Sequence, residues 1–140
     1  MSKQSFIYAG EQKTIVEAGL DLPIEKVSGN PEVLISNLNW KSNAEFQRPI
    51  LQTRDVNSSI GADGRTTVTG LLVNPNSFGF TRIEIAAAAE TADALTVGIS
   101  ETVIRDILPF EERAFTVIIP SLSVPAKNIS KNELFIEAFR

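Results

Sequence analysis

Residues 68–89 read VTGLLVNPNSFGFTRIEIAAAA, two apolar runs on either side of a short polar segment, NPNSFGF. Residues 65–74 and 78–90 are each predicted to be a β-strand. Apolar and β-branched residues dominate both runs, and no helix cap precedes the alanines. Asn, Pro and Ser favour turns, and Pro75 cannot donate a hydrogen bond to continue a ladder. The stretch predicts two buried strands joined by a tight turn, with a ligand-binding loop as the alternative.

Similar patterns extend outward from this stretch in both directions. Strands are also predicted at residues 34–40, 94–107, 113–120 and 132–139, where apolar residues tend to recur at every second position. Residues 55–65 are predicted to be a polar loop, whose Asp63-Gly64 dipeptide suits a hairpin turn.

These elements predict the fold class and its organisation. About seven short strands with turn signals between them, and no convincing helix, are typical of an all-β, antiparallel immunoglobulin-like β-sandwich. We expect residues 34–140 to form the sandwich domain. Residues 1–33 are irregular and carry a helix-breaking proline and a turn signal at 28–31, so they predict an N-terminal arm with short strands.

Composition narrows the function classes. The 140 residues include 13 Lys and Arg against 17 Asp and Glu, which gives a net charge of −4 and argues against nucleic acid as a partner. The chain has no cysteine and no histidine, so it lacks disulfides, thiolate metal sites and the usual general base. No segment resembles a signal peptide or a membrane span, so direct membrane insertion is not expected.

Carboxylates are the remaining candidates for chemistry. Glu111-Glu112 falls in a predicted turn, where two solvated side chains are expected, and no pair is placed across a cleft as a glycosidase requires. Asp55, Asp63 and nearby carbonyls could form a calcium loop, although their spacing matches no known one. We therefore predict no catalytic residue, no cofactor, no metal site and no small-molecule substrate.

Apolar residues outside the expected core are candidates for protein contacts. In the predicted last strand, Phe135 and Phe139 lie on the face opposite Leu134 and Ile136, so both faces are apolar and one needs a cover. The N-terminal arm is a candidate for this cover, within one chain or across subunits. Trp40 and Phe46 could anchor a partner, but closing one end of the core is the favoured alternative. The predicted interaction residues are Phe6, Ile7, Tyr8, Trp40, Phe46, Phe135 and Phe139.

The segments TVTGLLVNPNSFGFTRIEIAAA (67–88) and ILPFEERAFTVIIP (107–120) resemble three sets of immunoglobulin-like sandwiches. One is the FxLYD family of bacterial envelope modules, although IAAAAE stands where its name motif is expected. The second is the water-stress-and-hypersensitive-response domain, whose strand also runs into Asn-Pro-Asn. The third is a group of bacteriophage virion proteins. The resemblance implies a non-catalytic sandwich and carries no catalytic residues.

Together these observations predict a structural role. The chain is expected to be a subunit of a large assembly, a phage virion protein of the capsid-decoration, neck or tail type. Its expected partners are itself or other structural proteins of the same assembly, and its expected location is the virion. The alternative is an extracytoplasmic binding module of a membrane-anchored bacterial envelope protein. A carboxylate-based hydrolase is a third, less favoured class.

Overall fold

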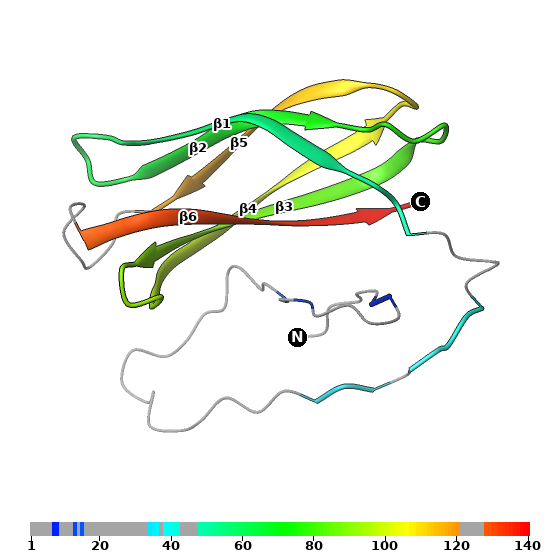
Figure 1. The fold of residues 1–140 in the computed structure, drawn as a ribbon, viewed down its shortest axis with the longest axis horizontal. Coiled ribbons are helices and arrows are strands. Elements are labelled where there is room, and N and C mark those ends of the chain that lie inside the picture. Colours follow the sequence, from blue (N-terminus) through cyan, green and yellow to red (C-terminus); the bar gives the residue numbers. More distant parts are fainter. Residues whose placement is uncertain are drawn as a thin grey trace.

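The regular secondary structure in the described part of the chain is β-strand (Figure 1). The structure is a computed structural model that describes residues 7–8, 13, 15, 34–36, 38–42, 48–120 and 128–140. The strands within these ranges are β1 (Gln52–Ile60), β2 (Thr66–Val73), β3 (Phe80–Thr91), β4 (Thr96–Ile107), β5 (Glu112–Ile119) and β6 (Ile129–Phe139).

The six strands form two three-stranded antiparallel sheets, with orders β1-β2-β5 and β4-β3-β6. This is the neighbour order of strands A-B-E and C′-C-F in an immunoglobulin-like sandwich. The predicted all-β sandwich is therefore confirmed. In that fold strand F has a second neighbour, strand G. Here β6 stands in the F position, and the described residues place no strand on its other side.

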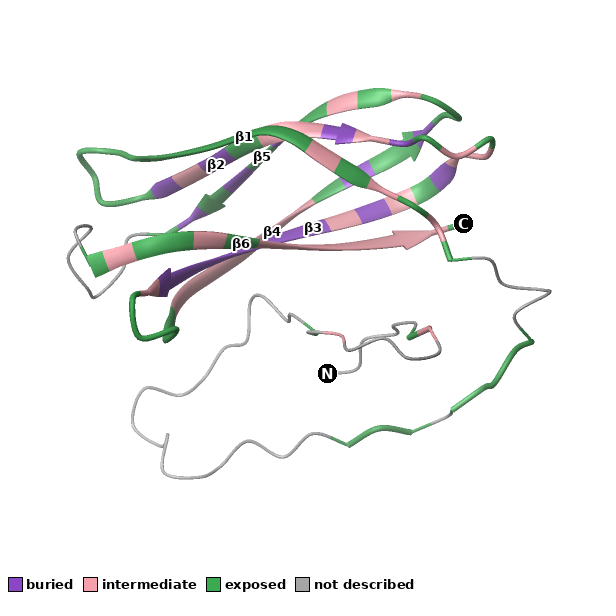
Figure 2. Ribbon diagram, viewed as in Figure 1, coloured by how far each residue is buried: buried purple, intermediate pink, exposed green. Residues whose placement is uncertain are grey.

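The core fills the space between the two sheets, and Figure 2 shows its buried residues. Each strand contributes alternate residues, because successive side chains point to opposite faces of a sheet. The buried core comprises Val68, Leu72, Phe80, Ile83, Ile85, Ala87, Ala89, Ile104, Ile107, Phe115, Val117 and Ile119. The sheets contact each other mainly along β5, which packs against β4 and β3.

The alanine run is part of the central strand of its sheet. β3 pairs with β4 on one side and β6 on the other, so its short side chains are flanked by larger ones. Ala86 and Ala88 are buried on the outer face, and Ala87 and Ala89 are buried in the core. Context here overrides the helix propensity of alanine, as the sequence analysis predicts.

Two predictions for the first half of the chain are wrong. Residues 34–36 and 38–42 are not in a strand, although residues 34–40 alternate. Residues 55–60, predicted to be loop, belong to β1. The predicted hairpin turn is confirmed, because Gly64 has φ 78° and donates its N–H to the Gly61 carbonyl. The domain boundary at residue 34 stays a prediction, as do most of the arm's short strands, although Ile7, Tyr8, Lys13 and Ile15 are not in one.

Candidate interaction surface

The Asn-Pro-Asn segment between β2 and β3 is a structural turn. Asn74 is fully buried, and its Nδ2 donates to the carbonyls of Phe78 at 2.9 Å and Leu108 at 2.8 Å. Its Oδ1 accepts from the Asn76 N–H at 3.1 Å and from Asn76 Nδ2 at 2.8 Å. Its own N–H donates to the Glu111 carbonyl at 2.9 Å. Each polar group of the Asn74 side chain therefore has a protein partner, and the ligand-loop alternative gains no support.

Asn76 extends this turn to two further parts of the chain. Its Nδ2 donates to the Ile50 carbonyl at 2.7 Å, and its Oδ1 accepts from the Ile50 N–H at 3.3 Å. Its carbonyl accepts from the Phe110 N–H at 3.3 Å. The start of β1 and the β4–β5 turn are thus both bonded to the β2–β3 turn at one end of the sandwich.

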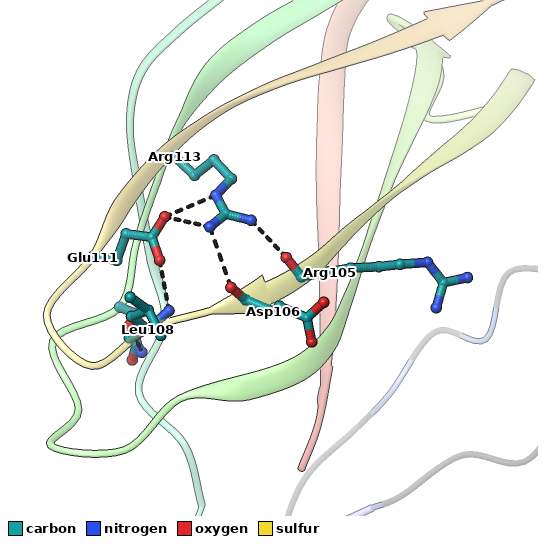
Figure 3. A network of polar contacts seen from close by, with 6 residues as sticks. Arg105, Asp106, Leu108, Glu111 and Arg113 are labelled. Atoms are coloured by element: carbon teal, nitrogen blue, oxygen red, sulfur yellow. Dashed lines mark hydrogen bonds and ion pairs between the residues drawn. The ribbon is translucent and has the colours of Figure 1, made fainter.

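A polar network holds the β4–β5 turn, where the chain crosses between the sheets (Figure 3). Glu111 accepts from the Leu108 N–H at 2.6 Å and from Arg113, and Arg113 also donates to the carbonyls of Arg105 and Asp106. The pKa of the Glu111 carboxyl lies below its ordinary value, first because of the Leu108 N–H and then because of Arg113. These groups bond to one another, so the network explains the conformation of the turn.

The residues considered for calcium do not form a site. Asp55 lies on β1, whereas Asp63 lies in the hairpin turn and accepts from the Arg65 N–H at 3.1 Å. Five strand residues follow Asp55 before the turn, a span of roughly 16 Å in extended chain. Among the described residues, no group of three or more His, Cys, Asp or Glu side chains could hold a metal ion. The described part also contains no helix long and apolar enough to cross a membrane.

The two phenylalanines of the last strand lie on its outer face, as predicted. Phe135 is opposite Ala86, and Phe139 is opposite Arg82, whose guanidinium carbon lies 4.1 Å from the Phe139 ring centroid. Both phenylalanines are half-buried. Between them Glu137 forms an ion pair with Lys13 at 2.6 Å. The N-terminal part of the same chain therefore contacts this face at one described point.

The other predicted interaction residues are separated. Ile7 is exposed, and Tyr8 is half-buried with the Arg48 guanidinium 5.9 Å from its ring. Trp40 is 80% exposed, so the alternative that it closes the core is wrong. Phe6 and Phe46 lie outside the described residues.

Sequence analysis missed the exposure of the residues around Trp40. Leu34, Ile35 and Leu38 were expected in a sandwich strand, but they are exposed, Leu38 to 66%. Four large apolar side chains, counting Trp40, therefore face solvent within seven positions of the sequence. The alternation of residues 34–40 is the signal that a β-structure would suit this segment, but it does not identify the partner strand.

The incomplete burial of β6 is the second feature that sequence analysis missed. Its core-facing residues Leu134, Ile136 and Ala138 pack against the core but remain partly exposed. On the same side of β6, Asn132 Oδ1 is buried and accepts no hydrogen bond. Because β5 lies over β4, β1 and β6 are the edges on the other side of the sandwich. This β1–β6 side is less well covered than the β4–β5 side.

Comparisons with known proteins give no family. No protein-family model matches the chain, and no curated protein matches it. Among solved structures, the chain is similar to the crystal structure of a DUF1425 family member from Shewanella sp. pv-4. The two share 14% sequence identity, the match covers 62% of this chain and 76% of that chain, and the TM-score is 0.45. A similarity at this level carries no conclusion about function.

Proposed function

We propose that this protein is a non-catalytic structural subunit of a repeated protein assembly and acts through protein–protein contacts. The observation that carries the proposal is the exposure of large apolar side chains in residues 34–36 and 38–42, among them Leu34, Leu38 and Trp40. Apolar side chains clustered on a surface mark interaction sites, and a tryptophan is a frequent anchor of such contacts. The partners are further copies of this chain or other structural proteins of the assembly.

The proposed setting is a phage virion, with the chain as a capsid-decoration, neck or tail component. The support for this setting is the resemblance of residues 67–120 to phage virion proteins with similar strands and turns. A sandwich whose surface contacts repeat by symmetry suits a particle built from many copies.

The assembly role is tested by the mass of the full-length chain in solution. Light scattering should give a multiple of 15.3 kDa for the wild type, and close to 15.3 kDa for the double variant Leu38→Ser/Trp40→Ser. Leu95→Ser is the matched control, because Leu95 is 64% exposed but lies in the β3–β4 turn. Equal masses for the wild type and the double variant would contradict a contact through residues 34–42.

The setting needs a separate experiment. Quantitative mass spectrometry should find the chain in phage particles purified from cultures of the organism that carries the gene. Recovery in the cell-envelope fraction instead would contradict the virion setting and support the extracytoplasmic binding module.

A further inference from the structure

We infer that the core binds a water molecule between Thr66 of β2 and Asn132 of β6, and that this water bridges the two sheets. Buried polar groups in proteins are almost always hydrogen-bonded, either to other protein groups or to ordered water. In the described part of the chain, two buried side-chain oxygens have no hydrogen-bond partner, Thr66 Oγ1 and Asn132 Oδ1. The site lies in the core of one chain and does not depend on the proposed assembly role.

The first of these oxygens lies in an apolar part of the core. Thr66 is the first residue of β2 and is 1% exposed. It shares the inward face of the strand with Val68 and Leu72, because the three positions have the same parity. Within its sheet it is flanked by Ile60 of β1 and Ile119 of β5. A hydroxyl in such surroundings is unfavourable unless it is hydrogen-bonded.

The second oxygen lies on the inward face of β6. Asn132 has the same parity as Leu134 and Ile136, which pack against the core. Its neighbour in the ladder is Ala89 of β3, which is fully buried. Alanine has a small side chain, so β3 contributes little volume at this level of the core. The Asn132 Oδ1 atom can only accept hydrogen bonds, and an alanine methyl group offers none.

The topology places Thr66 and Asn132 on facing sheets at the same end of the sandwich. β2 ends at the Asn74 turn and β3 starts after it, and β6 runs antiparallel to β3, so β2 and β6 both begin at the opposite end (Figure 1). Thr66 is next to Ile119 in one sheet, and Asn132 is next to Ala89 in the other. β5 packs against β3, so the strands beside them, β2 and β6, face each other across the core.

A water molecule has the hydrogen-bonding capacity that these two oxygens require. The Thr66 hydroxyl can donate and accept, whereas Asn132 Oδ1 only accepts. The two side chains do not bond to each other. One water can donate to Asn132 Oδ1 and accept from the Thr66 hydroxyl, so that a single molecule satisfies both groups. A hard cation such as Ca²⁺ takes about six to eight oxygen ligands, which two neutral oxygens do not supply.

The water would have the same role at this end of the sandwich as Asn74 has at the other. There the Asn74 side chain joins the β2–β3 turn to the β4–β5 turn through direct hydrogen bonds to the Phe78 and Leu108 carbonyls. Here the bridge would join β2 to β6 through a bound water.

Apolar variants of similar size test the bridge in the full-length chain. Thr66→Val and Asn132→Leu each remove one partner of the water. Each single variant should raise the equilibrium constant of unfolding in urea by about tenfold, because the remaining oxygen stays buried with its bridge broken. The double variant should unfold nearly as the wild type does, since replacing both partners by apolar groups leaves no buried oxygen unpaired.

Thr69→Val is the matched control for the substitution in β2. Thr69 lies on the same strand but is exposed, so its replacement should change the unfolding constant by less than about twofold. Its effect should also be additive with that of Asn132→Leu, because the two positions share no contact through the water.

Two results of this cycle would overturn the inference. If Thr66→Val and Asn132→Leu each stabilise the protein, both oxygens are buried without any partner and no water is bound. If each variant destabilises the protein and the two costs add in the double variant, the two oxygens do not share one water.

A crystal structure of the full-length chain tests the position of the water directly. We expect electron density for one ordered water within about 3.2 Å of both Thr66 Oγ1 and Asn132 Oδ1. This density should be absent from crystals of Thr66→Val/Asn132→Leu. A direct hydrogen bond between the two wild-type side chains, or a protein group bonded to either oxygen, would overturn the inference.

Discussion

β5 and β6 are both edge strands with alternating apolar residues, yet the sandwich covers them differently. On β5, Phe115, Val117 and Ile119 are buried. On β6, Leu134 and Ile136 face the same core but remain partly exposed. β5 packs against β4 and β3, and the chain turns directly from β4 into β5 beside the Arg113 network. No comparable connection covers β6 among the described residues.

The difference shows that one chain can complete its core on one side and leave it incomplete on the other. Burial of apolar surface is the main favourable term in folding. A core-facing side chain that remains partly exposed therefore stabilises the fold less than the same side chain would if it were fully buried. On β6, Leu134 and Ile136 therefore stabilise the fold less than fully buried side chains would. Unfolding experiments on matched variants measure this difference and the contacts of the turns and sheets around it.

The largest expected effect comes from one matched pair of isoleucines. Ile85 and Ile136 are opposite each other in the β3–β6 ladder and face the same core, but Ile85 is 0% exposed and Ile136 is partly exposed. In urea unfolding at low protein concentration, Ile85→Ala should cost about 3–4 kcal/mol and Ile136→Ala about 1–2 kcal/mol. Equal costs would show that the core beside β6 is as well covered as the core beside the central strand β3.

The next effect concerns the turn that joins the two sheets at one end. Asn74→Ala should lower the free energy of unfolding by about 3 kcal/mol, because the carbonyls of Phe78 and Leu108 lose their donor in a buried site. Asn76→Ala is the comparison, with a loss of about 1 kcal/mol, since Asn76 is only partly buried. Urea unfolding measures both, and a loss in Asn74→Ala no larger than in Asn76→Ala would refute the buried role.

A tight contact within the sheet of β5 gives a smaller effect. A Cβ at Gly70 would lie 2.8 Å from Cζ of Phe115, so Gly70→Ala should destabilise the protein by about 1–3 kcal/mol. Phe115→Leu removes the atoms in question. In the double variant, the additional cost of Gly70→Ala should therefore be smaller, which a double-mutant cycle measures. Additive costs would show that the ring moves aside freely.

The smallest effect is a pH dependence at the β4–β5 turn. The pKa of folded Glu111 lies below its ordinary value of 4.5, so its stabilising contribution is present above that value and disappears as pH falls through the folded pKa. Acidification below about 4.5 should therefore destabilise the wild type more than Glu111→Gln. Urea midpoints across this range measure the difference. In an Arg113→Met background, the difference in acid sensitivity between proteins with Glu111 and with Glu111→Gln should be smaller but still present, because the Leu108 N–H remains. If the urea midpoints of the wild type and Glu111→Gln fall in parallel with pH, Glu111 does not cause the pH dependence.

The sequence predicted the second half of the sandwich well, because its strands bury one face. Val117 and Ile119 alternate with exposed residues, so the period of two is visible in the sequence. Residues 55–60 of β1 were predicted to be loop because they are mostly polar. Nearly all residues of β1 are exposed, and an edge strand of this kind has no apolar period to detect. β1 is a strand because it pairs with β2. Such pairing depends on the neighbouring strand, so the local composition of a polar segment does not predict it.

The error at residues 34–40 has the opposite cause. The alternation there is real, but a strand forms only where a neighbouring edge accepts it, and within this chain no described strand does. The same limit applies to the interaction surface. Phe135 and Phe139 could be placed on the outer face of β6 from their period alone, whereas the exposure of Trp40 and the incomplete cover of Ile136 depend on where other segments lie.

The two hydrogen bonds between Asn76 and Ile50 have a mechanical consequence. They hold the chain where it leaves the N-terminal segment and enters β1. Tension on residues 34–42 would therefore reach the β2–β3 turn through Asn76 before it could peel β1 from β2. Asn74 passes the load on to the β4–β5 turn through the Leu108 carbonyl, so both sheets resist it together. A pull on the chain at Ile50 would therefore be opposed by both sheets before β1 separates from β2.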